Sequence, residues 1–553
     1  MKTERTILSI LVFVFAANVL SQVNDALISR EKLIQDIRQL VNILETAHPD
    51  PYIKGGGKIA FHRRIYKIMN SIPAEGLNLS EFGKMLSPIF VSIGDGHTRI
   101  NRTLSSDSLF TKIIPVKFRA IEKELYIAKV YEEQHRYLLG SKLIAVQGIP
   151  YDRLIERMYS LQPIENTYYA MKMLCRFIND KRYYKELLPE WKDRNNIMIK
   201  IKLASGKIEE VSLTTKEKLE NPIQQPTKIE IPSIEKSSIA YNFLDKKKKI
   251  ALLRIFTMNE YREHFEGVIN EIGSLGPVKD VAEESYERFN TEKAPSKDED
   301  IVSGLPSVVE LFIKLLEEMK SAGSENLLID LRGNTGGDDS MSAILLYFLY
   351  GKKGIENTNQ GIQVVKYSDF YFSFAKEVTL ESINKDRIMP LEKNDYDFSG
   401  EAESNFEITK EDLLNVWSKY KAMAEELKTG RHEKFYCPKN VIVICDEVTF
   451  SAGFDMMRDL YYNGATIVGV PSSQAGNSFG NIIMWKLANS GIEGSVSYKY
   501  DLSFPNDPVK GEVLTPHYVL TYKKLAEYGF DPNSSIRYAL ELLPMMNKKT
   551  DSK

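Results

Sequence analysis

VIVICDEVTFSAGFDMMRDL, Val441 to Leu460, is the stretch from which the fold can be worked out. Val441 to Cys445 is a continuous apolar run rich in β-branched residues, which predicts a strand buried on both faces. After a short connection, apolar residues recur at helical spacing, at Phe454, Met457 and Leu460. Ser451 is therefore expected at the turn where a buried strand becomes a helix.

A serine at such a turn has two possible roles. Backbone N–H groups at a helix start have no partner inside the helix, and the helix dipole adds partial positive charge there. Ser451 can therefore attack a carbonyl carbon while the amide of Ala452 faces the developing oxyanion. The alternative is structural, because Ser451 or Thr449 can cap the helix, which is the commoner role of such residues.

A second stretch, ENLLIDLRGNTGG at Glu325–Gly337, has the same organisation. Asn326–Leu331 predicts another buried strand, and Gly336 and Gly337 lie in a turn where backbone amides can approach a ligand closely. A helix is expected to follow, with Ser340 as its N-cap. Two such units in one parallel sheet place both turns at its carboxyl edge, where α/β sheets bind ligands.

Three motifs together resemble the tail-specific (C-terminal-processing) and tricorn-core serine peptidase family. They are DLRGNTGG at Asp330–Gly337, TFSAGFD at Thr449–Asp455 and GDGHT at Gly94–Thr98. GDGHT resembles the histidine-bearing segment of the tricorn-like and retinoid-binding-protein-like branch. The resemblance runs in order from near residue 30 to near residue 540. It implies an α/β fold, a mixed-sheet peptidase core of crotonase-like ββα units with an N-terminal helical region and a PDZ-like β-rich module.

The resemblance also implies roles for individual residues. Ser451 would be the nucleophile and His97 the general base, while the amides of Ala452 and of Gly336 or Gly337 would form the oxyanion hole. Tail-specific peptidases use a lysine downstream of the nucleophile as base, but Asn477 occupies that position here. A Ser–His arrangement is therefore preferred. The alternatives for the base, which lie in no matching motif, are His432 and His517.

The third member of the catalytic group stays open. In the tricorn-like branch a serine beside the histidine and a glutamate near the closing segment complete a tetrad. Here Gly96 stands beside His97, and Glu512 lies close to the glutamate position but out of register. Asp95 is another group that can orient the imidazole. His48, in the Pro-rich sequence HPDPY, is expected at the surface or as a cap.

The chain is expected to divide into four parts: a signal peptide at 1–21, an N-terminal helical region carrying the histidine segment at 22–104, the PDZ-like module at 105–215 and the peptidase core at 216–545. Insertions are expected near 278–305 and 366–433, the first as a solvated loop because residues 278–302 are polar and charged. The PDZ-like module lacks a clear Gly-Leu-Gly-Phe loop. A structural β subdomain is therefore the alternative to peptide capture.

The first 21 residues have the pattern of an export signal. Lys2 and Arg5 precede an apolar run, Ile7–Ala17, that is too short to span a bilayer. Small residues then allow cleavage before Gln22, and an uncleaved anchor is the alternative. The mature protein is expected to be periplasmic or extracellular, without a stable membrane anchor.

Composition limits the possible partners. The 73 basic and 75 acidic residues give a net charge of −2, which points to neither nucleic acid nor an anionic membrane. Cys445 is expected to be a packed thiol, while a Cys175–Cys437 bridge is possible in an oxidising compartment. No residue cluster has metal-ligand spacing, so no metal or cofactor is expected.

The sequence therefore predicts an exported serine peptidase acting on peptides or proteins. The alternative is a non-catalytic protein on the same fold that binds apolar ligands or peptides. A fluorophosphonate probe distinguishes them, because it should label only an activated serine. Nothing in the sequence indicates the oligomeric state.

Overall fold

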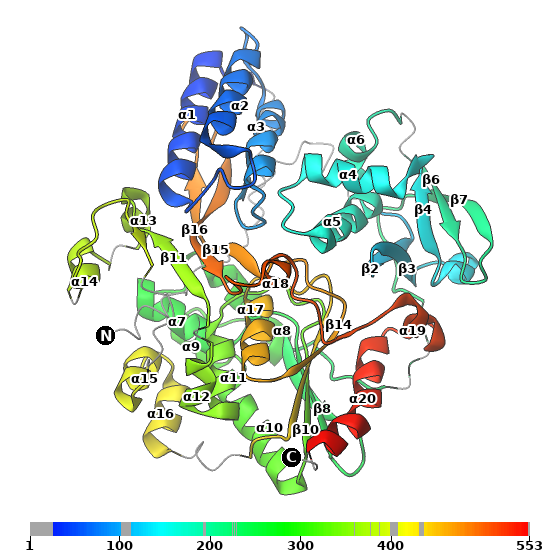
Figure 1. Ribbon diagram of the computed structural model, residues 1–553, viewed down its shortest axis with the longest axis vertical. Helices are drawn as coiled ribbons and strands as arrows, with labels where there is room; N and C mark the ends of the chain where they lie inside the picture. The colour runs from blue at the N-terminus through cyan, green and yellow to red at the C-terminus, as the bar shows by residue number, and fades with distance from the viewer. Residues whose placement is uncertain are drawn as a thin grey trace.

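A computed structural model describes residues 26–550, except 101–111, 192–194, 224, 226, 228, 359, 376–377, 386, 399–406 and 431–435. The expected signal peptide at 1–21 lies outside the described residues. The described chain forms three β-sheets with helices packed against each of them (Figure 1). The predicted mixed α/β architecture is confirmed.

The core sheet has the strand order β17-β14-β13-β10-β9-β8. Neighbouring strands are parallel except β8 and β9, which pair as an antiparallel hairpin at the sheet's edge. The strands of this sheet are β8 (Ile239–Phe243), β9 (Ile250–Ile255), β10 (Asn326–Asp330), β13 (Asn440–Cys445), β14 (Thr466–Gly469) and β17 (Tyr518–Val519).

Both central strands, β10 and β13, are buried along their whole length. In β10, Leu327 and Ile329 pack with helices α10 (Val308–Ala322), α11 (Ser340–Tyr350) and α17 (Ala452–Tyr462). Leu328 points to the other face, where helix α20 (Ser534–Thr550) covers the sheet. Because successive strand residues face opposite sides, a strand covered on both faces must be apolar throughout. This explains the continuous apolar runs in the sequence.

The turns that follow β10 and β13 lie side by side. Asp330 pairs with Ile444 in the parallel register, so both strands end at the same edge of the sheet. The Phe450 amide donates to the Asn334 carbonyl at 2.9 Å, and the Thr449 hydroxyl donates to the Leu331 carbonyl at 3.0 Å. These bonds bring the glycine turn against the residues just before Ser451.

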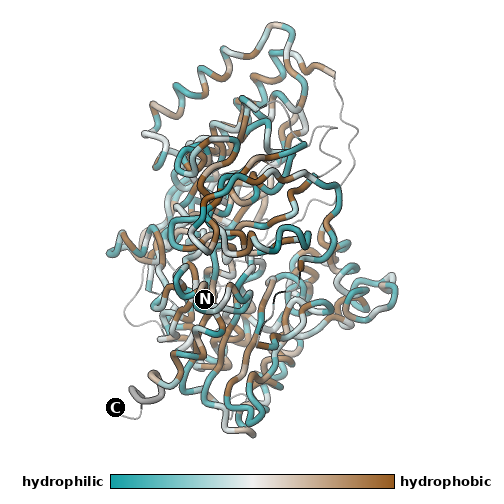
Figure 2. Tube along the Cα trace, turned by 90° about the vertical axis from the view of Figure 1, so that its right-hand side faces the viewer, coloured by the Kyte–Doolittle hydropathy of each residue, from teal (hydrophilic) through white to brown (hydrophobic). Residues whose placement is uncertain are grey.

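The second sheet has the order β1-β16-β11-β12, and β15 pairs with β16 along its length. Helices of the N-terminal region pack on it through a shared apolar cluster, and they lie directly above its strands in Figure 1. Hydrophobic and hydrophilic residues alternate along these helices, as the helix at the top of Figure 2 shows. The elements are α1 (Arg30–Ala47), α2 (Gly57–Ser71), α3 (Leu79–Ile93), β1 (Arg99–Ile100), β11 (Ile362–Lys366), β12 (Tyr396–Asp397), β15 (Asn477–Lys486) and β16 (Glu493–Leu502).

The third sheet is antiparallel and has the order β2-β3-β4-β6-β7, with β5 on β4. With its helices it forms one apolar cluster, and residues 112–214 are called the β-rich module below. The sequence predicted a β-rich unit here; its likeness to a PDZ domain stays a prediction. The elements are β2 (Val116–Ile121), β3 (Glu124–Val130), β4 (Lys142–Val146), β5 (Ile149–Pro150), α4 (Tyr151–Leu161), α5 (Thr167–Asn179), α6 (Tyr184–Leu187), β6 (Asn196–Lys202) and β7 (Ile208–Thr214).

Residues 278–302 do not form the solvated loop that the sequence suggested. They contain helices α8 (Lys279–Asn290) and α9 (Asp298–Ser303). Four apolar residues of this segment, Val278, Ala282, Ile301 and Val302, are buried in a small cluster against helix α7 (Arg262–Ile272). A short apolar face suffices because α7 supplies the rest of the cluster.

The segment 366–433 contains several short elements. Helices α15 (Lys410–Trp417) and α16 (Lys421–Thr429) lie near its end, and Trp417 and Tyr420 at the junction between them turn into the core and are fully buried. The remaining short α-helices are α12 (Lys352–Glu356), α13 (Asp369–Phe374), α14 (Leu380–Asn384), α18 (Pro508–Glu512) and α19 (Tyr522–Glu527).

Two further expectations concern cysteines and membranes. Cys175, Cys437 and Cys445 are free thiols, so the Cys175–Cys437 bridge is not formed, and Cys445 is buried as expected. Within the described ranges, no helix combines the length and the apolarity needed to cross a bilayer.

Candidate active site

Ser451 lies between β13 and α17 in a backbone conformation that side chains seldom adopt. Its φ is +54° and its ψ is −135°, and its side chain makes no capping hydrogen bond to the helix. The structure therefore does not show the capping role. A residue in such a region costs about 1–3 kcal/mol, and such residues concentrate at functional sites. The Ser451 amide donates to the Gln474 side chain, which fixes the turn.

Gly336 is in direct contact with the turn that carries Ser451. A Cβ at this position would lie 2.6 Å from the Ser451 Cβ and 2.9 Å from the Ala452 nitrogen, and φ is +102°. Only glycine permits this approach. The Gly336 amide itself donates to the Asn334 side chain at 2.8 Å.

The amides of Ala452 and Gly337 line the same pocket as Ser451. Within the described chain, neither amide donates a hydrogen bond to another group. The Ala452 amide is at the start of α17, where N–H groups lack helical partners. Gly337 is held at φ +144° against Met258, where a Cβ would lie 2.4 Å from the Met258 carbonyl carbon.

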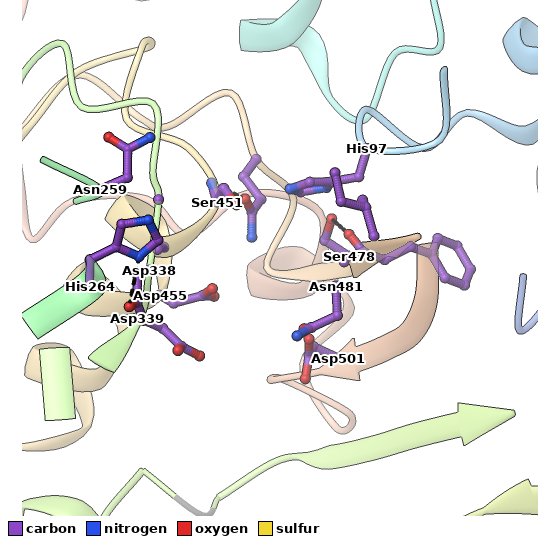
Figure 3. A pocket seen from close by; sticks show the side chains of 16 residues that line it. His97, Asn259, His264, Asp338, Asp339, Ser451, Asp455, Ser478, Asn481 and Asp501 are labelled. Atoms are coloured by element: carbon purple, nitrogen blue, oxygen red, sulfur yellow. Dashed lines mark hydrogen bonds and ion pairs between the residues drawn. The ribbon is translucent and has the colours of Figure 1, made fainter. Parts of the chain in front are cut away.

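His97 faces Ser451 across this pocket. It comes from the GDGHT loop between α3 and β1, and its ring points toward Ser451 in Figure 3. The ring stacks on Phe450, the residue before the serine, with 4.8 Å between ring centroids. Ser495 of β16 donates to the His97 carbonyl at 2.7 Å. The second sheet thus holds the histidine loop beside the core sheet's edge.

Two buried carboxylates face the Nδ1 atom of His97. Asp95 Oδ1 lies 3.7 Å from it and Glu165 Oε1 lies 3.9 Å from it. Burial alone would lower the His97 pKa, but these negative charges outweigh burial and raise the pKa above its usual value. Sequence reasoning found Asp95 and missed Glu165, which lies between α4 and α5 in no motif.

His48 is buried, not at the surface as expected from its Pro-rich loop. Its Nε2 atom lies 3.3 Å from Asp95 Oδ2, and its Nδ1 accepts the Asp50 amide. The loop after α1 therefore folds onto the histidine segment. Burial would raise the Asp95 pKa, but His48 and His97 hold it well below its usual value.

The other candidates from the sequence lie elsewhere. Glu512 is exposed at the end of α18 and does not line the pocket. His517 accepts the Ile467 amide at 3.0 Å and stacks on Tyr461, also outside the pocket. His432 lies outside the described residues. The structure therefore brings His97 into Ser451's pocket, with Asp95 beside the His97 ring, but it does not bring Glu512 or His517 there.

No lysine lines the pocket among the described residues. Asn477, at the position where the resemblance would place a lysine, bonds with both its oxygen and its nitrogen to the Phe504 backbone. Lys172 of α5 is a further basic group nearby. Its Nζ donates to Ser473 Oγ at 3.2 Å and lies 4.8 Å from the Phe450 ring centroid. Burial lowers the Lys172 pKa to about 8.

The end of the pocket away from His97 is acidic (Figure 3). Asp338 bonds to His264 at 3.1 Å, and burial raises the pKa of Asp455 to about 6. The aspartates lining the pocket are Asp338, Asp339, Asp455 and Asp501.

One group of described residues has donor atoms that converge as metal ligands would. It consists of Asp95, His97 and Glu165, with ligand atoms within 4.8 Å of one another. The same arrangement, an imidazole beside carboxylates, is also that of a general base and its orienting groups. The expectation that no metal or cofactor is needed stays a prediction.

Comparisons with known proteins agree with the sequence motifs. Residues 303–500 match the family model of peptidase family S41, a segment that contains Ser451 and the glycine turn but not His97. Among solved structures, mature CPAF complexed with lactacystin is similar, with a TM-score of 0.56 and 14% identity over 94% of this chain and 99% of that chain. Mature CPAF gives a TM-score of 0.55 and 14% identity over 94% and 98% of the two chains. A comparison with curated proteins finds no sequence that matches.

Proposed function

We propose that this chain, which belongs to peptidase family S41 through residues 303–500, hydrolyses peptide bonds with Ser451 as nucleophile and His97 as general base. The observation that carries the proposal is one shared pocket. Ser451, on a strained strand-to-helix turn, lines it together with His97 and the amide-bearing residues Ala452 and Gly337. A serine, an imidazole and free amides are the groups that acyl transfer requires.

The reaction follows from how His97 is oriented. Because Nδ1 faces the carboxylates, Nε2 is the nitrogen left to take the Ser451 proton. The Ser451 oxygen attacks the scissile carbonyl carbon, and His97 then gives the proton to the leaving amine. Water, deprotonated by His97, hydrolyses the acyl-enzyme and restores the free serine.

The amides of Ala452 and Gly337 are proposed as the oxyanion donors. Their support is that both line the pocket and neither is engaged elsewhere in the described chain. Gly336 has a different role here, since its amide is engaged by Asn334 and its missing side chain leaves room for Ser451. Removing one oxyanion donor typically costs about 100-fold or more in rate.

Asp95, rather than Glu512, is proposed to orient His97. Asp95 Oδ1 accepts the His97 backbone amide at 2.8 Å and also faces the imidazole. Its other oxygen accepts the Ser497 hydroxyl at 2.7 Å, so the carboxylate is fixed from two sides. Glu512 has no such place beside the ring.

Export is also proposed, from the basic and apolar pattern of residues 1–21. Mass analysis of the exported protein should find an N-terminus near Gln22. A protein that keeps Met1 in the cytoplasm would contradict export but leave the catalytic proposal intact.

Turnover of an unfolded protein substrate tests the peptidase proposal. Wild type and Ser160→Ala, which removes an exposed serine of α4, should cleave it. Ser451→Ala should lower kcat by several orders of magnitude while its melting temperature stays within a few degrees of wild type. If the wild type cleaves nothing but binds apolar ligands or peptides, the alternative of a non-catalytic binding protein is supported instead.

A further inference from the structure

Glu165 is a buried carboxylate that joins three separate segments. Its side chain is 2% exposed. Oε1 accepts the Gly96 amide at 3.0 Å, and Oε2 accepts the Ala475 amide at 3.0 Å and the Ser478 hydroxyl at 2.9 Å. One side chain of the β-rich module therefore holds both the histidine loop and the pocket wall that starts β15.

The Oε1 atom of Glu165 also faces the His97 ring. The Nδ1 atom of His97 is buried and makes no hydrogen bond within the described chain. It lies between Asp95 Oδ1 and Glu165 Oε1, at 3.7 and 3.9 Å. Leaving a buried polar nitrogen unpaired costs about 1–3 kcal/mol, so the gap calls for an explanation. Catalytic hydrogen bonds are often long without substrate and tighten in the reacting complex.

Gly96 explains how Glu165 reaches this place. A Cβ at position 96 would lie 2.7 Å from Glu165 Oε1 and 2.9 Å from the Tyr169 ring. A side chain at position 96 and the Glu165 carboxylate would therefore compete for one space. In this chain that space is filled by Glu165.

We propose that Glu165 is a positioning residue for the reaction proposed above. With Asp95 it holds the His97 ring so that Nδ1 keeps its proton and Nε2 faces Ser451. It also stabilises the imidazolium that forms when His97 takes the serine proton. The β-rich module thus contributes a group to the active site, and the site is incomplete without that module.

Burial and the neighbouring charges act on the Glu165 carboxyl in opposite directions. Burial, followed by the negative charge of Asp95, raises the Glu165 pKa, opposed by His97 and Lys54. The Asp95 pKa is held low, so Asp95 keeps its negative charge when Glu165 is replaced. The titratable and charged groups around His97 and its two carboxylates are His48, Lys54, Asp95, Arg99, Glu165, Tyr169 and Lys172.

The test is Glu165→Gln, which keeps the side chain's size and removes its charge. The His97 pKa, followed by NMR of 13C-labelled histidines, should fall by about 1 unit because a negative charge within about 4 Å is lost. The rate of fluorophosphonate labelling at Ser451 should fall about 10-fold or more, since the new amide can favour the wrong imidazole tautomer. The acid limb of the pH profile for the labelling rate should move to lower pH by the same amount as the His97 pKa.

The matched control is Glu263→Gln, which removes another buried carboxylate that accepts a serine hydroxyl and a backbone amide. It should leave the His97 titration unchanged. Glu165→Asp keeps the charge but withdraws it, so His97 should retain a higher pKa than in Glu165→Gln while labelling still slows. A folded Glu165→Gln with a wild-type His97 pKa, or Glu165→Asp labelled at the wild-type rate, would overturn the proposal. The NMR readout needs no turnover, so a shifted His97 pKa in a protein without peptidase activity would reject only the proposed function.

Discussion

Ser451 holds a backbone conformation, φ +54° and ψ −135°, that glycine adopts without penalty and other residues do not. The Ser451→Gly variant should therefore raise the free energy of unfolding by about 1 kcal/mol, because it releases strain at that position. Ser451→Ala keeps the Cβ and serves as the control. Both should be inactive, and only the glycine variant should be more stable in denaturant unfolding. Equal stability of the two would mean that the turn stores no strain.

His97 sets the expected pH dependence. Burial lowers the His97 pKa, but Asp95 and Glu165 raise it by more than burial lowers it, so the net direction is upward. A general base must be neutral, so activity should be lost as the pH falls through this raised pKa. The acid limb of kcat/KM should accordingly lie above about 6.5, the usual histidine value. An acid limb near pH 5 would show that the two carboxylates do not stabilise the imidazolium.

Among the structural elements, the glycine turn after β10 controls where Ser451 sits. Gly336→Ala should abolish activity and lower stability by more than about 2 kcal/mol, because its Cβ would overlap the Ser451 Cβ and φ is positive. Gly148→Ala is a control with a φ of +75° and no atom within 4 Å of the new Cβ. It should cost only about 1 kcal/mol and leave activity unchanged. Comparable unfolding free energies for the two variants would contradict the predicted overlap.

Both strand–turn–helix units could be predicted because each is formed by consecutive residues. The apolar run before Ser451 indicates a buried strand, and the glycines after Asp330 indicate a close turn. Neither inference needs information from the rest of the chain. Glu165 and His48 could not be found in this way. Their partners, Gly96 and Asp95, lie 69 and 47 positions away, and only the packing of separate elements brings them together.

At the scale of the whole molecule, Arg119 of β2 links the β-rich module to the loop that precedes Ser451. Its guanidinium lies 2.5 Å from Asp446 and 2.5 Å from Glu447, which precede Ser451. The carboxylates are buried and the arginine side chain is 36% exposed. Arg119→Met should destabilise the protein by about 2 kcal/mol at neutral pH, less than the loss of a fully buried partner because water screens the pair.

The exposed pair of Arg136 and Glu133 provides the control for Arg119, since Arg136→Ala should change the unfolding free energy by less than about 1 kcal/mol. Burial would raise the Asp446 pKa, but Arg119 and backbone amides lower it. A lowered carboxyl pKa contributes stability above its unfolded value, about 3.9, and loses it as the pH falls. The Arg119→Met effect should therefore shrink in acid, and an effect constant down to pH 2 would contradict a charge-based link.

The N-terminal helices, the β-rich module and the core sheet each supply part of one site: His97 and Asp95, Glu165, and Ser451 with its amides. The presence of N-terminal helices and of the two strand–turn–helix units was predictable from motifs and patterning. Their meeting was not, because it depends on contacts such as Arg119 with Asp446 that leave no local pattern. For the same reason, the packing of residues 278–302 against α7 could not be predicted from the sequence.

The rate at which a fluorophosphonate modifies Ser451, with the modified residue identified by mass spectrometry, tests the central claim most directly. We predict a single adduct on Ser451 in the wild type, none in Ser451→Ala, and labelling slowed by about 100-fold or more in His97→Ala. Lys172→Met, which removes the other basic group beside Phe450, should leave the adduct on Ser451 and slow its formation far less. An adduct on another residue, or a His97→Ala variant labelled at the wild-type rate while Lys172→Met is not, would contradict the account.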